Sequence, residues 1–232
     1  MGQNDLQYIQ VEDCSIAYRR RSGNAPTLVF FPGYASDMEG AKALALDAFA
    51  ERSGVAILRF DYSGTGSSKG AFEDGRLDRW LSEALAVIDA LTEGPLIPIG
   101  SSMGGWIALH IALLRPDRVR ALVGIAAAPD FTNWGFADGD TAVRQGLNRN
   151  FWESGQRLLL LEGEIGIDCP VRLVHGELDP DVPLDIAFRT MRALRSSDVQ
   201  LSVIKGGGHR LSEPHEIEAI LRTVKALLEP VS

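Results

Sequence analysis

Short apolar runs alternate along the chain with segments whose apolar residues recur at helical spacing. The runs are rich in β-branched and aliphatic residues and end at glycine or turn residues: 27–31, 55–60, 96–99, 122–125, 171–174 and 199–204. Helical spacing occurs in residues 41–50, 77–91, 106–114 and 217–228. Continuous apolar runs are typical of parallel strands that are covered on both faces. The alternation therefore predicts an α/β fold with a mostly parallel central sheet, right-handed crossovers and helices on both faces.

Two parts of the chain depart from this alternation of strands and helices. Residues 7–19 alternate apolar and polar positions, which predicts an antiparallel hairpin at the sheet edge. Residues 130–168 contain no strand pattern and are rich in glycine and aromatic residues. Connections in α/β units usually span about 2 to 6 residues plus a helix, so about 40 residues here predict an inserted cap. We expect residues 1–232 to form a single domain, with the cap at residues 130–168.

Charge and composition narrow the possible partners and compartments. The chain has 31 acidic and 23 basic residues and a net charge of -8, which argues against nucleic acid or an anionic membrane as the main partner. The run Arg19 to Arg21 is interpreted as a solvated turn. Cys14 and Cys169 lack metal-ligand spacing, the first residues do not resemble a signal peptide, and no apolar stretch is long enough to span a bilayer. We therefore expect a cytoplasmic protein without a stable membrane anchor; the oligomeric state stays open.

The segment 96–106 has the pattern of a catalytic nucleophile. It contains an apolar strand, then Gly100-Ser101-Ser102-Met103-Gly104, then a helix. In this G-x-S-x-G arrangement the serine lies on a sharp, strained turn at the carboxyl end of the strand. Gly100 and Gly104 are needed because a Cβ at either position would collide across the turn. Ser102 is therefore the candidate nucleophile.

A serine nucleophile needs a base and an acid that orients the base, and in the fold that uses this turn they follow in the order serine, acid, histidine. Asp179 follows the strand at 171–174 and a turn, and His209 follows the strand at 199–204 and a glycine-rich loop. The carboxyl ends of three parallel strands would bring these side chains to one edge of the sheet. We predict the triad Ser102, Asp179 and His209.

Other residues compete for these roles. Asp181, two residues beyond Asp179, is the rival acid. The remaining histidines are expected to be structural or on the surface: His110 in the helix after Ser102, His175 before the acid, and His215 at a helix start. Ser101 and Ser67 are interpreted as polar loop residues. We therefore expect loss of turnover in His209→Ala and Ser102→Ala but not in His215→Ala.

A tetrahedral intermediate also needs two backbone N–H donors for its oxyanion. The residue after the nucleophile, Met103, supplies one, and the loop that follows the strand at 27–31 supplies the other through Tyr34. The glycine-rich loop at 61–68 does not fit a nucleotide-binding pattern, and the chemistry requires no metal or cofactor.

Together these motifs resemble the α/β-hydrolase superfamily over residues 8–228. Segments 59–64, 100–106 and 169–173 are most similar to the branch that contains the mitochondrial palmitoyl-protein thioesterase, also known as mycophenolic acid acyl-glucuronide esterase. The resemblance implies hydrolysis of thioesters or acyl esters through an acyl-serine intermediate, with the triad on Ser102, Asp179 and His209. Relative to that branch, we expect this chain to lack the mitochondrial targeting extension.

The substrate is expected to be a small-molecule or protein-borne acyl ester or thioester. The predicted cap contains four aromatic residues: Trp134, Phe136, Phe151 and Trp152. If these residues line the cap, they would favour binding of an apolar acyl or aromatic group, although packing of the cap onto the core explains them equally well. One alternative is a carboxylesterase for small esters or acyl glucuronides. Another is a catalytically silent binding protein on the same fold.

Overall fold

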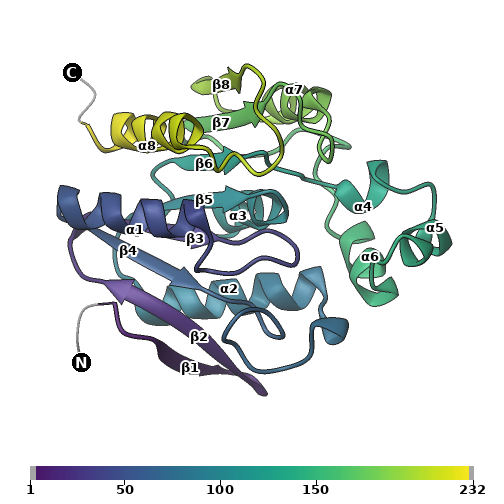
Figure 1. Ribbon diagram of the computed structural model, residues 1–232, viewed down its shortest axis with the longest axis horizontal. Helices are drawn as coiled ribbons and strands as arrows, with labels where there is room; N and C mark the ends of the chain where they lie inside the picture. The colour runs from purple at the N-terminus through teal and green to yellow at the C-terminus, as the bar shows by residue number, and fades with distance from the viewer. Residues whose placement is uncertain (1–3, 230–232) are drawn as a thin grey trace.

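The computed structural model describes residues 4–229, which contain one eight-stranded sheet (Figure 1). Its strand order is β1-β2-β4-β3-β5-β6-β7-β8. β1 (Gln7–Val11) and β2 (Cys14–Arg21) form the antiparallel hairpin expected at the edge, and β2 pairs antiparallel with β4. The other pairings are parallel and involve β3 (Asn24–Phe31), β4 (Val55–Phe60), β5 (Leu96–Ser101), β6 (Leu122–Ile125), β7 (Val171–Gly176) and β8 (Val199–Ile204).

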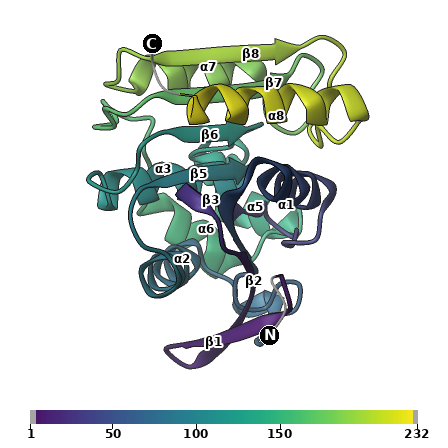
Figure 2. The ribbon, with the colours of Figure 1, turned by 90° about the vertical axis from the view of Figure 1, so that its left-hand side faces the viewer.

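Helices cover both faces of this sheet, as Figure 2 shows. α1 (Ala41–Ser53) and α8 (Pro214–Leu228) pack on one face, where their apolar side chains meet β3, β4, β5 and β6. α2 (Leu77–Leu91), α3 (Met103–Leu114) and α7 (Leu184–Ala193) lie on the other face. Each central strand is therefore buried on both sides, which is the physical reason for its uninterrupted apolar sequence. The predicted α/β-hydrolase fold is confirmed.

The sequence located most of these elements well. The bounds of β4, β6, β8 and α2 agree with the predicted ranges, and the other predicted strands and helices lie within longer elements. α7 was not predicted, although it starts directly after Pro183 and has a buried face that includes Ile186 and Thr190. Sequence reasoning thus found the sheet but missed one covering helix.

Residues between β6 and β7 form three short helices beyond the carboxyl ends of the central strands (Figure 1). These are α4 (Phe131–Trp134), α5 (Gly139–Arg144) and α6 (Arg149–Gln156). A further short turn of 3-10 helix, η1 (Phe72–Asp74), precedes α2. α6 contacts α2, α4 and α5, so the segment is packed onto the sheet layers and onto itself.

The helices of the described chain are too short or too polar to cross a membrane. Among residues 4–229, none has the length and hydropathy of a membrane-spanning helix.

Candidate active site

Ser102 lies on the tight turn between β5 and α3. Its backbone has φ 54° and ψ -120°, a region that a residue with a Cβ occupies only under strain. A Cβ on Gly100 would lie 2.2 Å from the carbonyl oxygen of Gly104, and a Cβ on Gly104 would lie 2.0 Å from that of Phe31. Both contacts are impossible, so Gly100 allows β5 to approach α3 and Gly104 allows α3 to approach the end of β3.

Three side chains from different strand ends form one hydrogen-bonded chain. Ser102 Oγ lies 3.0 Å from His209 Nε2, and His209 Nδ1 lies 2.9 Å from Asp179 Oδ2. Ser102 follows β5, Asp179 follows β7, and His209 follows β8. The structure therefore brings together the three residues that the sequence singled out, in the order that nucleophilic catalysis requires.

The environment of Asp179 determines which nitrogen of His209 carries the proton. Burial by itself would raise the pKa of Asp179, but the hydrogen bonds from His209 and from two backbone N–H groups outweigh it and lower the pKa. The two backbone donors are Asp181 and Val182, at 2.9 and 2.8 Å from Oδ1. An ionised carboxylate only accepts hydrogen bonds, so Nδ1 of His209 carries the hydrogen and Nε2 is free to accept one from Ser102.

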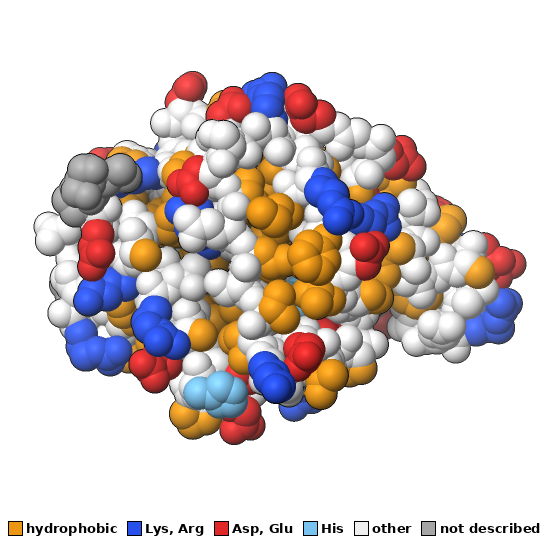
Figure 3. Space-filling model, turned by 90° about the horizontal axis from the view of Figure 1, so that it is seen from above, with side chains coloured by type: hydrophobic (Ala, Val, Ile, Leu, Met, Phe, Trp, Pro, Cys, Tyr) orange, Lys and Arg blue, Asp and Glu red, His pale blue; other side chains and the backbone are white. Residues whose placement is uncertain are grey.

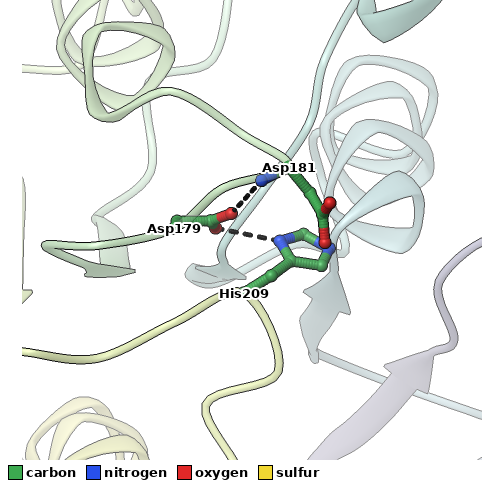
Figure 4. A group of neighbouring side chains, drawn as sticks. All are labelled: Asp179, Asp181 and His209. Carbon is green, nitrogen blue, oxygen red and sulfur yellow. Dashed lines mark hydrogen bonds and ion pairs between the residues drawn. The ribbon is translucent and has the colours of Figure 1, made fainter.

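Asp181, the rival acid, lies beside His209 but is not its hydrogen-bonded partner. Figure 4 shows its carboxylate on the side of the imidazole ring away from Asp179. Asp181 is exposed, and its backbone N–H supports Asp179. Asp179, Asp181 and His209 each place one potential metal-binding atom within 4.8 Å of the others. Since both ring nitrogens of His209 already have hydrogen-bond partners, a cation held by these residues would displace the contact to Asp179 or to Ser102, and the residues do not fit a resident metal.

The other histidines occupy structural or surface positions. Nε2 of His110 lies 2.9 Å from the carbonyl oxygen of Leu158, and burial lowers the pKa of its imidazole. His175 is buried and donates from Nε2 to the carbonyl of Val182. His215 is exposed in the first turn of α8. His209 is thus the histidine in contact with Ser102.

The two residues expected to supply the oxyanion donors are both close to Ser102 in the structure. Met103 is the first residue of α3, where backbone N–H groups have no acceptor within the helix. Tyr34 lies in the loop after β3 and, with Ser102, lines two pockets. Asp61 braces this loop, since it accepts a 2.7 Å hydrogen bond from the N–H of Met38. Burial of Asp61 raises its pKa, which is consistent with a structural position.

Two pockets meet at Ser102 and His209. The first, which we call the cap pocket, has a volume of about 330 Å³ and is lined by residues of α4 and of the loop after β7. The second, which we call the α1 pocket, has a volume of about 450 Å³ and is lined by the loop after β3, the start of α1 and the loop after His209. Both are in the size range of small-molecule sites.

The four aromatic residues predicted in the cap divide into two pairs. Trp134 and Phe136 line the cap pocket. Phe151 is fully buried, with its ring centroid 4.9 Å from that of Tyr34 and 5.4 Å from that of Trp80. Trp152 is half-buried and packs against Gly139. Phe151 and Trp152 are absent from the lining of both pockets, which corrects the expectation for them: α6 turns their side chains into packing contacts.

Sequence reasoning missed several residues that line these pockets. Phe131 and Val182 add apolar surface to the cap pocket, and Lys42 and Arg210 add positive charge to the α1 pocket. Arg210 could have been found from the sequence, because it directly follows the candidate base His209. Lys42 could not, since it lies in an ordinary amphipathic helix and reaches the site only through the fold.

Comparisons with known proteins identify the family of this chain. Residues 26–156 match the family described as the alpha/beta hydrolase fold. The chain is 34% identical over 238 residues to the human mitochondrial palmitoyl-protein thioesterase ABHD10, covering 94% of this chain and 78% of that protein.

Two solved structures share the fold over nearly the whole chain. Alpha/beta hydrolase domain-containing protein 10 from mouse has a TM-score of 0.90 at 33% identity, covering 97% of this chain and 98% of that chain. A putative hydrolase from Agrobacterium vitis has a TM-score of 0.90 at 36% identity, covering 97% and 99% respectively. The similarity therefore includes the segment between β6 and β7 as well as the sheet.

Proposed function

Because the chain belongs to the alpha/beta hydrolase fold family, and is homologous to ABHD10, we propose that it is a serine hydrolase that cleaves acyl thioesters or carboxylic esters. The observation that carries the proposal is the hydrogen-bonded chain from Ser102 through His209 to Asp179, at 3.0 and 2.9 Å. A hydroxyl in contact with an oriented imidazole is the arrangement that makes serine nucleophilic.

In the proposed reaction, His209 Nε2 takes the proton of Ser102 while Oγ attacks the acyl carbonyl. His209 then gives this proton to the departing alcohol or thiol, leaving an acyl-serine. Water, deprotonated by the same nitrogen, releases the acid and restores Ser102. Asp179 stays ionised throughout, since its lowered pKa keeps it a carboxylate at neutral pH, and it stabilises the imidazolium.

The backbone N–H groups of Tyr34 and Met103 form the oxyanion hole in this mechanism. The first turn of α3 supports this role, because its N–H groups and helix dipole favour negative charge beside Ser102. Removal of one such donor typically slows catalysis about 100- to 1000-fold.

Residues 130–168 act as a small cap on a single domain. Trp134 and Phe136 contribute aromatic surface to the cap pocket, which supports binding of an apolar acyl or aromatic group there. The cytoplasmic location stays a prediction, since the thioesterase relatives are named as mitochondrial proteins. Fractionation of the native cells decides between the two compartments.

The relatives' name favours thioesters, whereas small carboxylic esters and acyl glucuronides remain the competing substrates. Matched acyl thioesters and oxyesters of 4, 8 and about 16 carbons, assayed in parallel, separate these classes. We expect higher kcat/KM for thioesters, with all activity lost in Ser102→Ala. Faster hydrolysis of short oxyesters would select the carboxylesterase function. A folded protein inactive on every member would contradict the hydrolase proposal and leave a silent binding protein.

A further inference from the structure

The two pockets that meet at Ser102 differ in charge and polarity. The cap pocket is largely apolar, and Asp181 is its charged residue. Its apolar lining consists of Ala128, Phe131, Trp134, Phe136, Pro180 and Val182. The α1 pocket holds two cations, Lys42 and Arg210, and one acid, Asp37. The nucleophile therefore lies between an apolar pocket with one negative charge and a polar pocket with a net positive charge.

Lys42 is half-buried at the start of α1. Its Nζ donates a hydrogen bond to the backbone carbonyl of Arg210. An ammonium group has three donors, so this bond leaves two for a ligand. Within residues 4–229, Lys42 forms no ion pair. Burial lowers the pKa of Lys42, the Glu216 carboxylate opposes this shift, and the charge of Arg210 adds to it.

Arg210 places a second positive charge next to the base. It is exposed, directly follows His209, and has no ion-pair partner in the part of the chain that the structure describes. Two acids near these cations accept backbone N–H groups: Asp37, which lines the pocket, accepts that of Glu39, and Glu216, whose charge acts on Lys42, accepts that of Glu213 in the capping box of α8. A guanidinium group and an ammonium group from residues that line the same pocket are suited to a carboxylate or a phosphate.

We propose that the α1 pocket binds an anionic leaving group, in which an alcohol or thiol carries a carboxylate or a phosphate, while the cap pocket holds the apolar acyl chain. This inference rests on the proposed function. The Ser102 Oγ–acyl carbon bond forms, the bond from that carbon to the leaving sulfur or oxygen breaks, and the leaving atom receives the serine proton from His209. Lys42 and Arg210 bind the distant anion and take no part in proton transfer.

Asp181 should make the same site select between acyl chains. Its carboxylate lines the cap pocket, where it repels another group of the same sign. Acyl chains that end in a carboxylate are therefore disfavoured relative to plain alkyl chains. The two ends of the substrate are thus distinguished by opposite charges on either side of Ser102.

Matched substrate pairs test this assignment directly. One pair is octanoyl-phosphopantetheine and octanoyl-pantetheine, which differ in a phosphate; the other is the octanoyl thioesters of 3-mercaptopropionate and 3-mercaptopropionamide, which differ in a carboxylate. The readout is the ratio of kcat/KM for the anionic and neutral members. We expect a ratio of about ten in at least one pair, since a charged hydrogen bond contributes about one decade or more. The pair that shows it identifies the anion.

Two variants and one control connect the ratio to the pocket. Lys42→Met and Arg210→Gln should each bring the ratio to within about twofold of one, whereas Lys205→Met, which removes an exposed charge outside both pockets, should leave it unchanged. Lys42→Met also removes the hydrogen bond to the Arg210 carbonyl next to His209. A loss of activity from movement of that loop would lower kcat/KM for both members of a pair and leave their ratio unchanged. The ratio should also fall as salt is raised from 0.02 to about 0.5 M.

The experiment distinguishes failure of this inference from failure of the proposed function. Hydrolysis of the neutral members that depends on Ser102 establishes the hydrolase, whatever the ratio. Equal rates within both pairs, or a ratio that Lys42→Met and Arg210→Gln leave at the level of Lys205→Met, would overturn the anionic leaving group. Absence of hydrolysis for all four substrates would overturn both proposals.

Discussion

The sheet edge that carries Ser102 and the helical segment above it are held in different ways. Ser102, Asp179 and His209 follow the ends of paired strands, and backbone hydrogen bonds fix the turns that present them, such as Ser102 N–H to the carbonyl of Ile125 at 2.9 Å. The helical part of the segment 130–168, up to Leu161, is held to the rest of the chain through side chains, whereas Ile165 forms backbone hydrogen bonds with Ala193 and Arg195. Trp106 Nε1 donates to the carbonyl of Leu158, and Asp130 accepts from the N–H groups of Leu160 and Leu161.

Because of this difference, the two regions should respond differently to substitution. Backbone pairing across β5, β7 and β8 fixes the distances within the triad, so most substitutions elsewhere should leave the chemistry intact. Side-chain contacts fix the cap, so single truncations there should change stability and substrate choice. Substitutions in the two regions should therefore give measurably different results.

Replacement of the base should give the largest effect. His209→Ala removes the acceptor for the Ser102 proton, and we expect kcat to fall by about 10⁵- to 10⁶-fold, as for removal of a base in other triads. His215→Ala, an exposed histidine of α8, is the matched control and should stay within about twofold of the native enzyme. Steady-state hydrolysis of an activated ester measures both. Comparable losses in the two variants would remove His209 from the mechanism.

The acid is tested by two neighbouring substitutions. Asp179→Asn keeps the shape but reverses the hydrogen bonding to His209 Nδ1, and we expect kcat to fall about 10⁴-fold. Asp181→Asn keeps its backbone N–H bond to residue 179, so kcat on a neutral ester should change by less than about tenfold. The same ester assay distinguishes them. A larger loss in Asp181→Asn would make the rival residue the acid.

Truncation inside the cap should affect stability more than chemistry. Phe151→Ala removes a fully buried ring that contacts Tyr34 and Trp80, and we expect a loss of about 3 to 5 kcal/mol in the free energy of unfolding. Val143→Ala, at an exposed position of α5, is the control, with a change within about 0.5 kcal/mol. Denaturant titration measures both. An equal, small change would show that Phe151 does not hold the cap.

An ion-pair cluster between α2 and the cap should give the smallest effect. Burial opposes ionisation of Asp78, but hydrogen bonds from Arg76 and Arg157 outweigh it and lower its pKa to about 2. Its contribution to stability is therefore present above the ordinary value near 3.8 and is lost as pH falls toward 2. Exposure of the cluster limits this contribution to less than about 1 kcal/mol. Asp78→Asn should flatten that part of the stability profile; an unchanged slope between pH 4 and 2 would contradict it.

The same contrast explains what the sequence could predict. Strands such as Leu122–Ile125 and the tight turn at Ser102 can be predicted from short stretches of sequence, because apolar runs and G-x-S-x-G follow from backbone packing alone. Nothing local separates Trp134, which lines a pocket, from Phe151, which is buried. Their positions depend on contacts between distant segments, as does that of Lys42. The sequence therefore predicted which side chains the structure brings together at Ser102, but not the residues that line the two pockets.

Covalent labelling shows whether Ser102 is an activated nucleophile. The folded protein is incubated with a fluorophosphonate probe, which reacts with activated serine hydroxyls, and the adduct is located by intact mass and peptide mapping. We predict one adduct per chain, on Ser102, with none in Ser102→Ala and far slower labelling in His209→Ala. A folded protein that stays unlabelled, or that is labelled equally in Ser102→Ala, would contradict the account.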